Sequence, residues 1–116
     1  MELTKRIEEY DAVQTWFGGL REHWGEEPSD KEGKLRALAD FCDLVERDPD
    51  AIVADCSREV ESGKRIRIKA RRLYTAKIEE FQASVDGGRL ARGKAGNTIR
   101  SFMIHNGIFM QGDAQG

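Results

Sequence analysis

A run of closely spaced basic side chains is the part of this sequence with the clearest chemistry. Six of the nine residues from Lys64 to Arg72 are lysine or arginine, and no acidic residue occurs between Lys64 and Lys77. An exposed helix face normally mixes the two signs, so that Glu and Lys pair along it. Like charges at this density repel one another unless an external anion neutralises them. We therefore interpret the run as an anion-binding surface, in preference to an ordinary solvated helix face.

The charges of the chain are divided between its two parts. Residues 1–63 carry 8 basic and 17 acidic side chains, a net charge of −9, whereas residues 64–105 carry 11 basic and 3 acidic ones, a net charge of +8. The formal net charge of −2 for the whole chain conceals this division. A chain polarised in this way predicts that its second part contacts a polyanion.

Two predicted helices and the joint between them carry the candidate binding residues. Arginine outnumbers lysine 12 to 7 in the chain, which favours forked contacts to phosphates or guanine edges. Helical periodicity also leaves Ile68 facing water beside the basic stripe. We interpret Asn97 as an ordinary exposed amide, although an asparagine can also read adenine. The full set of predicted DNA-binding residues is Lys64, Arg65, Lys69, Arg72, Arg89, Arg92, Lys94, Asn97 and Arg100.

No catalytic or metal-binding constellation is recognisable. The two histidines, His23 and His105, have no matched Ser, Cys or carboxylate at a diagnostic spacing, and no Gly-rich phosphate loop or Gly-x-Ser-x-Gly motif occurs. Cys42 and Cys56 stand apart without metal-ligand spacing, so we predict that both are buried thiols in a reducing compartment. We expect no catalytic residue, no metal, no cofactor and no small-molecule substrate.

Apolar residues recur with helical rather than period-two spacing, which predicts an all-α chain. Ser29 or Asp30 and, further on, Asp48 are placed to cap helices, Pro49 to open one, and Asp86-Gly87-Gly88 to end one. Gly18-Gly19 interrupts the first helix, where the helix can bend or end, or a neighbouring helix can pack closely. The expected helices cover about residues 3–24, 31–46, 49–56, 64–86 and 91–106.

The same periodicity assigns side chains to the core. Trp16 and Trp24 are expected in the core or at its edge, and residues 108–110 should fold back over the bundle. The inner series of the basic helix is Ile66, Ala70, Leu73, Tyr74, Phe81 and Val85. The last helix should turn Ala95, Ile99, Phe102 and Met103 inward, and Lys94, Asn97, Arg100, Ser101 and His105 outward.

Length and hydropathy favour a single domain, which we place at residues 1–110. No apolar run approaches the roughly 18 residues that a membrane span needs, and the first ten residues, MELTKRIEEY, lack the apolar core of a signal peptide. We therefore expect a cytoplasmic protein that does not contact a membrane.

Three segments in this order resemble a known family: ADFCDLVERDPDAI, KIEEFQASVDGG and NTIRSFMIHNGI. They look like the N-terminal core-binding domain of tyrosine recombinases of the phage-integrase type, in its archaeal or phage-like branch. The resemblance covers nearly the whole chain. The family often has Ser or Thr before its last helix, where this chain has Ala91-Arg92-Gly93. The matching residues are Phe41, Asp48, Pro49 and Ile52, then Ile99, Arg100, Ser101, Phe102, Met103, Asn106, Gly107 and Ile108.

The resemblance implies a SAM-like orthogonal bundle of four or five helices. It also implies that the domain forms a clamp around double-stranded DNA together with a separate catalytic domain, alongside other recombinase protomers. On this reading residues 111–116 begin the linker to that absent domain, and the chain itself is not an enzyme. The reactions implied for the full-length protein are DNA integration and recombination.

Two other interpretations remain open. The acidic half of one copy could meet the basic half of another, so the chain could be a helical protein–protein interaction or assembly domain. Binding of single-stranded nucleic acid or RNA is less favoured, because it would require exposed aromatic residues among the cations.

Overall fold

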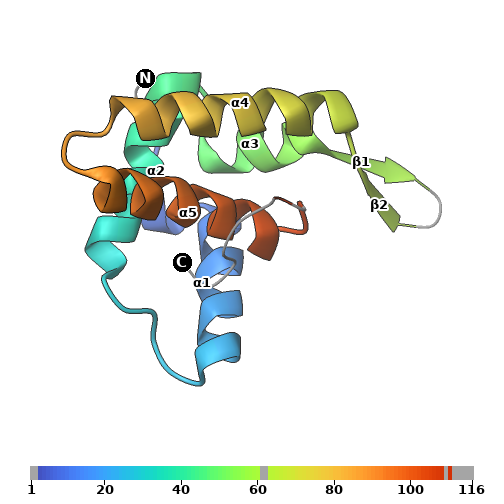
Figure 1. Ribbon diagram of the computed structural model, residues 1–116. Coiled ribbons are helices and arrows are strands. Elements are labelled where there is room, and N and C mark those ends of the chain that lie inside the picture. Colours follow the sequence, from blue (N-terminus) through green and yellow to red (C-terminus); the bar gives the residue numbers. More distant parts are fainter. Residues whose placement is uncertain (1–2, 61–62, 109, 111–116) are drawn as a thin grey trace.

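Five α-helices and one short antiparallel hairpin make up the described part of the chain (Figure 1). The computed structural model describes residues 3–60, 63–108 and 110, and only the backbone of 58–60 and 63–66. The elements are η1 (Ile7–Glu9), α1 (Asp11–Trp24), α2 (Lys31–Val45), α3 (Pro49–Cys56), β1 (Ser57–Val60), β2 (Gly63–Ile66), α4 (Ile68–Ser84) and α5 (Arg89–His105). The expected all-α bundle is therefore present, with a hairpin added. None of the described helices has the length and apolar character to cross a membrane.

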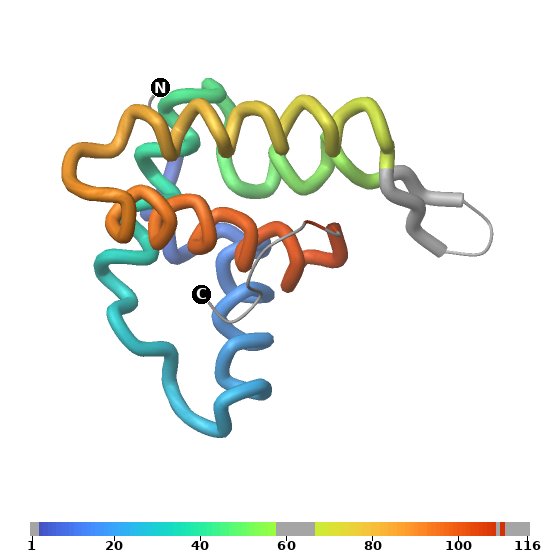
Figure 2. Tube along the Cα trace, in the orientation of Figure 1, coloured from blue at the N-terminus to red at the C-terminus, as the bar shows by residue number. Residues whose placement is uncertain are grey.

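Helix α5 lies at the centre of the arrangement. It runs alongside α4 and also packs against α1 and α2 (Figure 1). The chain trace in Figure 2 shows how α1 and α2 are joined at the far end of the molecule from α4. Helix α5 therefore has most of its helix–helix packing with α4, α1 and α2.

The first long helix begins at Asp11, not near Leu3 as the sequence predicted. Tyr10 has an extended backbone, with φ −70° and ψ 138°, which separates α1 from the short η1 turn. The Asp50 carboxylate of α3 accepts a hydrogen bond of 2.8 Å from the backbone N–H of Ala12. A side chain from another helix thus satisfies a donor at the start of α1, where the first N–H groups have no partner within the helix.

The predicted cap of the third helix is confirmed, and of the two candidates for the second helix Asp30 is the cap, not Ser29. Asp30 accepts a hydrogen bond from the Gly33 N–H, and Asp48 accepts one from the Ala51 N–H. Pro49 occupies the first turn of α3, where its missing N–H would have no partner in any case.

The basic helix begins at Ile68, and the prediction that it starts at residue 64 is wrong. Residues 63–66 form β2, which pairs with β1 so that Arg58 lies opposite Arg65 and Glu59 opposite Lys64. The Arg67 N–H donates to the Cys56 carbonyl at 2.8 Å and closes the base of the hairpin. The backbone N–H and C=O groups of this segment form hydrogen bonds between the two strands, so they are not available for the hydrogen bonds of a helix.

The glycine pair in α1 allows a close approach between helices. A Cβ atom at Gly19 would collide with the imidazole of His105 on α5, whereas a Cβ at Gly18 would meet its nearest atom at 3.8 Å. Of the alternatives open from the sequence, close packing of a neighbouring helix is the one observed.

The core centres on Trp16, which is fully buried and packs edge-on against Phe102 with their ring centroids 5.5 Å apart. Its indole N–H donates to the Ser101 Oγ at 3.1 Å. Ser101 is also fully buried, so the prediction that it faces outward is wrong. A serine on the inner side of α5 is accommodated because it supplies an acceptor to a buried donor.

Most other core predictions are confirmed. Ile108 and Met110 are buried, whereas Phe109 and the predicted linker 111–116 lie outside the described residues. Both cysteines are buried, and burial raises the pKa of Cys42 to about 12 and that of Cys56 to about 11. Both therefore remain thiols at neutral pH.

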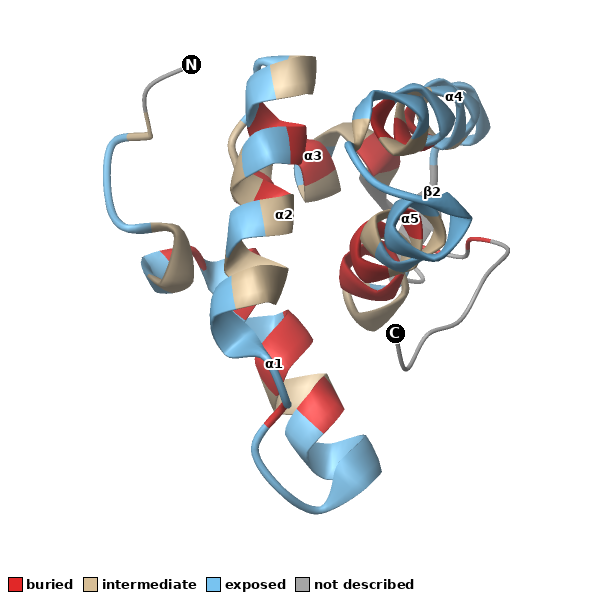
Figure 3. Cartoon of the chain, turned by 60° about the vertical axis from the view of Figure 1, so that its left-hand side comes forward, coloured by how far each residue is buried: buried red, intermediate tan, exposed pale blue. Residues whose placement is uncertain are grey.

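Leu73, predicted to face the core, is exposed instead, and so is Trp24, which was predicted in the core or at its edge. Trp24 is 55% exposed at the end of α1, and Leu73 is 56% exposed on α4. Ile78, one turn beyond Tyr74 on α4, is buried and takes the inward position that was predicted for Leu73. The buried residues of α4 are Tyr74, Ile78 and Phe81, and Figure 3 shows much of this helix in the colour of exposed residues. The predicted inner residue Ile66 lies in the hairpin, and its side chain is outside the described residues.

A cluster of three polar side chains fastens α4 to α3. Asp55 accepts two hydrogen bonds from Arg47, at 2.7 and 3.0 Å, and one from the Tyr74 hydroxyl at 2.7 Å. Burial raises the pKa of Asp55, but the hydrogen bonds from Arg47 and Tyr74 outweigh that effect and hold it below its usual range. The pKa of Tyr74 is raised, first by burial and then by its bond to Asp55. Asp55 is therefore ionised and Tyr74 neutral at pH 7.

Candidate nucleic-acid interface

The surface formed by α4 and α5 carries most of the predicted binding residues, and we call it the α4–α5 face. The helical region 67–105 holds nine basic and three acidic side chains, a net charge of +6. The two helices run side by side (Figure 1). Two hollows follow the line where these helices meet.

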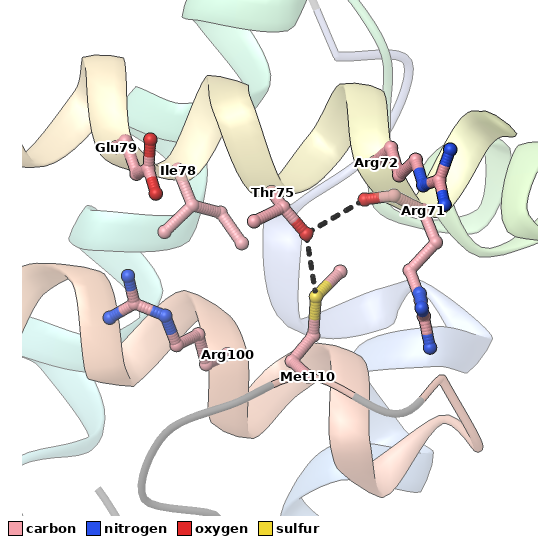
Figure 4. Close-up of a pocket in the computed structure, with 7 residues that line it drawn as sticks. All are labelled: Arg71, Arg72, Thr75, Ile78, Glu79, Arg100 and Met110. Atoms are coloured by element: carbon pink, nitrogen blue, oxygen red, sulfur yellow. Dashed lines mark hydrogen bonds between the residues drawn. The ribbon is translucent and has the colours of Figure 1, made fainter. Parts of the chain in front are cut away.

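The first hollow is a cleft of about 350 Å³ near the N-terminal end of α4 (Figure 4). Arg100 reaches into it from α5, and Thr75 on its α4 wall donates to the Arg71 carbonyl. Its lining residues are Arg71, Arg72, Thr75, Ile78, Glu79, Arg100 and Met110. Three arginines and one glutamate thus border the same small space.

The second hollow is wider and more open, at about 680 Å³, and lies at the turn between the two helices. It brings together four of the predicted binding residues, Arg89, Arg92, Lys94 and Asn97. Leu90, which is 90% exposed, also lines it. The remaining lining residues, Gln82, Ala83 and Gly93, belong to the facing parts of the two helices.

The α4 members of the predicted set are divided by the structure. Lys69 and Arg72 are exposed on α4, and Ile68 beside them is 57% exposed, as expected. Lys69 lines neither hollow. Lys64 and Arg65 belong to β2, so the predicted helical stripe that includes Arg65 is wrong. Their side chains lie outside the described residues.

The cations of the α4–α5 face differ in how firmly they are held. Arg92 donates to the Val85 carbonyl at 3.1 Å, and Lys94 lies 3.5 Å from the Asp30 carboxylate of the acidic half. That ion pair is well exposed, so its contribution to stability is small. Arg72 and Arg89 are exposed, and within the described residues neither forms an ion pair with a carboxylate.

Arg100 is the most firmly held of the set. Its guanidinium donates to the Gln82 side-chain oxygen at 2.5 Å and to the Asn97 side-chain oxygen at 3.1 Å. Both Arg100 and Asn97 are half-buried rather than fully exposed. Asn97, which the sequence left as an ordinary exposed amide, therefore has a definite role in holding Arg100.

Four polar residues of α4 that line the two hollows were not among the predicted site residues: Arg71, Thr75 and Glu79 in the first hollow and Gln82 in the second. Successive members are three or four residues apart, so they form one stripe of α4 on the side that faces α5. Helical periodicity was sufficient to find this stripe. Its significance depends on α5 lying beside it, which is a tertiary fact that the local pattern does not contain.

The α4–α5 face offers groups suited to binding an anion. Among the described residues, no group of three or more His, Cys, Asp or Glu side chains is placed to hold a metal ion. What the α4–α5 face supplies is a set of arginine and lysine donors, amide groups and a hydroxyl along two hollows. Compared with protein-family models, with curated proteins and with solved structures, the chain matches none of them.

Proposed function

We propose that this chain binds double-stranded DNA through the α4–α5 face. The observation that carries the proposal is the state of the five arginines lining the two hollows, Arg71, Arg72, Arg89, Arg92 and Arg100. Within the described residues none of them forms an ion pair with a carboxylate. Cations gathered in this way repel one another, and a polyanion that neutralises them stabilises the surface.

The dimensions of the face suit a duplex. Each helix has 17 residues and is therefore about 25 Å long at 1.5 Å per residue. DNA rises about 3.4 Å per base pair, so the face would span roughly seven base pairs. Exposed arginines and lysines would neutralise phosphates along this length and release their counterions.

Within this function, we favour the role of a non-catalytic, core-binding domain of a tyrosine recombinase. Support comes from the segment IRSFMIHNGI and from the order of the helices. Ile99, Phe102, Met103 and Ile108 of that segment are buried, so these residues support a similar packing scheme and carry no chemistry themselves. Catalysis would belong to another domain of the full-length protein.

The proposal is tested by the salt dependence of binding to random-sequence duplex DNA. Non-specific binding of about 10⁻⁴–10⁻⁶ M at physiological salt is expected. Each lost phosphate contact makes the slope of log K against log salt shallower by about 0.9. Replacing three exposed cations of the face with glutamine should therefore flatten the slope by roughly two to three units. The variant is Lys69→Gln/Arg72→Gln/Arg89→Gln.

A matched triple replaces three exposed arginines outside the face: Arg6→Gln/Arg21→Gln/Arg36→Gln. It removes the same type of charge, and binding should stay close to that of the wild type. Equal losses from the two triples would mean that net charge alone drives association. Absence of DNA binding, together with self-association in sizing chromatography, would support the assembly domain instead.

A further inference from the structure

The guanidinium of Arg100 is fixed in orientation without being neutralised. Its two partners, Gln82 and Asn97, are uncharged amide oxygens on neighbouring helices, and no described carboxylate forms an ion pair with it. A guanidinium has five N–H donors, so two hydrogen bonds leave others for a ligand. A fork already held in one geometry loses less side-chain freedom when it binds.

A glycine on α5 makes this arrangement possible. Gly96 is buried opposite Gln82, and a Cβ atom there would collide with the Gln82 side chain. Because Gly96 lacks that atom, Gln82 can lie across the α5 backbone and reach Arg100. Gly93, three residues earlier, has open space where its Cβ would be. Of these two glycines, only Gly96 therefore makes room for the Gln82 side chain.

The cleft in front of Arg100 suits an uncharged hydrogen-bond acceptor better than a phosphate. Glu79 lines the same cleft beside the arginines (Figure 4). A phosphate only accepts hydrogen bonds, so it would leave this carboxylate without a donor. A base edge carries no net charge, and guanine presents the N7 and O6 acceptors that an arginine fork matches. The same carboxylate can accept from the amino group of the paired cytosine.

The geometry points to Arg100 as the residue with which this surface reads a guanine in duplex DNA, with Gln82 and Gly96 as positioning residues. This inference rests on the DNA-binding function proposed above. It separates the cations into two kinds. Arg72 and Arg89, exposed and without carboxylate partners, contact phosphates and set affinity, whereas the held Arg100 sets sequence preference.

The test is selection of bound sites from a duplex library with a randomised core, followed by titrations on the selected site and on the same site with its guanine replaced. The wild-type chain should select a guanine position and lose about 5- to 150-fold in affinity when that guanine is changed. Arg100→Lys keeps the charge but removes the fork, so the discrimination should disappear while the salt slope stays unchanged. Arg72→Gln should do the reverse, flattening the slope by about 0.9 and leaving the discrimination intact.

The positioning chain is tested with variants that keep Arg100 itself. Gly96→Ala should displace the flexible Gln82 side chain and weaken the guanine discrimination with little change in the unfolding midpoint, and Gln82→Ala should do the same. Gly93→Ala is the matched control and should leave discrimination as in the wild type. Circular dichroism of each variant checks that the helices remain.

Four results would overturn the inference. A wild-type chain that binds DNA but selects no base would refute it and leave the proposed function standing. So would an Arg100→Lys variant with a changed salt slope and unchanged discrimination, because Arg100 would then contact a phosphate. An Arg100→Lys variant with a lowered unfolding midpoint and unchanged discrimination would make Arg100 a strut between α4 and α5. Absence of any DNA binding by the wild type would remove both proposals together.

Discussion

Replacing Ser101 with alanine should destabilise the protein, because it removes the acceptor of a buried hydrogen bond from Trp16. The Trp16 indole N–H donates to the Ser101 Oγ at 3.1 Å, and both residues are fully buried. Without the hydroxyl, this indole donor loses its acceptor in a part of the core that water does not reach. Leaving a buried donor unsatisfied costs about 1–3 kcal/mol.

For a chain of this size, each kcal/mol corresponds to about 4 °C in the melting temperature, so Ser101→Ala should lower Tm by roughly 4–12 °C. Thermal unfolding followed by circular dichroism measures this directly. The matched control is Ser84→Ala on α4, where an exposed hydroxyl donates to the Phe81 carbonyl. That change should stay within about 0.5 kcal/mol of the wild type.

A double-mutant cycle with Trp16→Phe isolates the hydrogen bond itself. Once the indole donor is gone, removal of the Ser101 hydroxyl should cost less than it does in the wild type, since no donor is left unsatisfied. An Ser101→Ala variant that melts within 2 °C of the wild type, at roughly 0.5 kcal/mol, would refute the reasoning. Ser101→Ala costs of equal size in the wild-type and Trp16→Phe backgrounds would also refute it.

Three further predictions concern the scaffold. Asp48→Ala removes the cap of α3 and should cost about 1 kcal/mol, read as a lower urea midpoint; an unchanged midpoint would contradict the cap. Because Arg47 and its neighbours lower the folded pKa of Asp55, this carboxylate stabilises the protein fully above its unfolded pKa near 3.9. That stabilisation should be lost as pH falls through the lower pKa of the folded state. Asp55→Asn should therefore be less stable than the wild type at neutral pH, and the difference in unfolding free energy should shrink at low pH. A difference that stays the same down to low pH would argue against the linkage. Gly19→Ala should destabilise by about 1–3 kcal/mol because its Cβ collides with His105, whereas the control Gly18→Ala should be neutral or slightly stabilising.

The parts of the fold that local chemistry determines could be predicted from the sequence. The caps Asp30 and Asp48 and the opening Pro49 each act within one turn of their own helix, and α2 and α3 end within one residue of the expected positions. The apolar stripe of α5 was also predictable, apart from Ser101. A polar residue on an inner stripe is recognised only when its distant partner, here Trp16, is known to lie beside it.

The hairpin and the details of the binding surface depend on tertiary structure. The segment 63–66 continues a strongly basic run, which made one long helix the simplest interpretation, but pairing with residues 57–60 determines its backbone. The sequence indicated that Lys69, Arg72 and Arg89 are exposed and that Arg100 belongs to the same surface. It did not show that Gln82 reaches Arg100, because that contact needs two helices side by side and a glycine at position 96.

The central position of α5 also has a consequence for how the chain folds during synthesis. The Trp16 indole cannot form its hydrogen bond until Ser101, 85 residues further along, has been synthesised. At about 5–20 residues per second the ribosome needs roughly 4–17 s to make that stretch. Until then α1, α2 and α4 lack the helix against which each packs, so their apolar stripes stay open to other chains and to chaperones. Nascent chains stalled before residue 89 should therefore remain protease-sensitive, with helix but no fixed core. Completion of the last helix would convert them to the folded domain in one cooperative step.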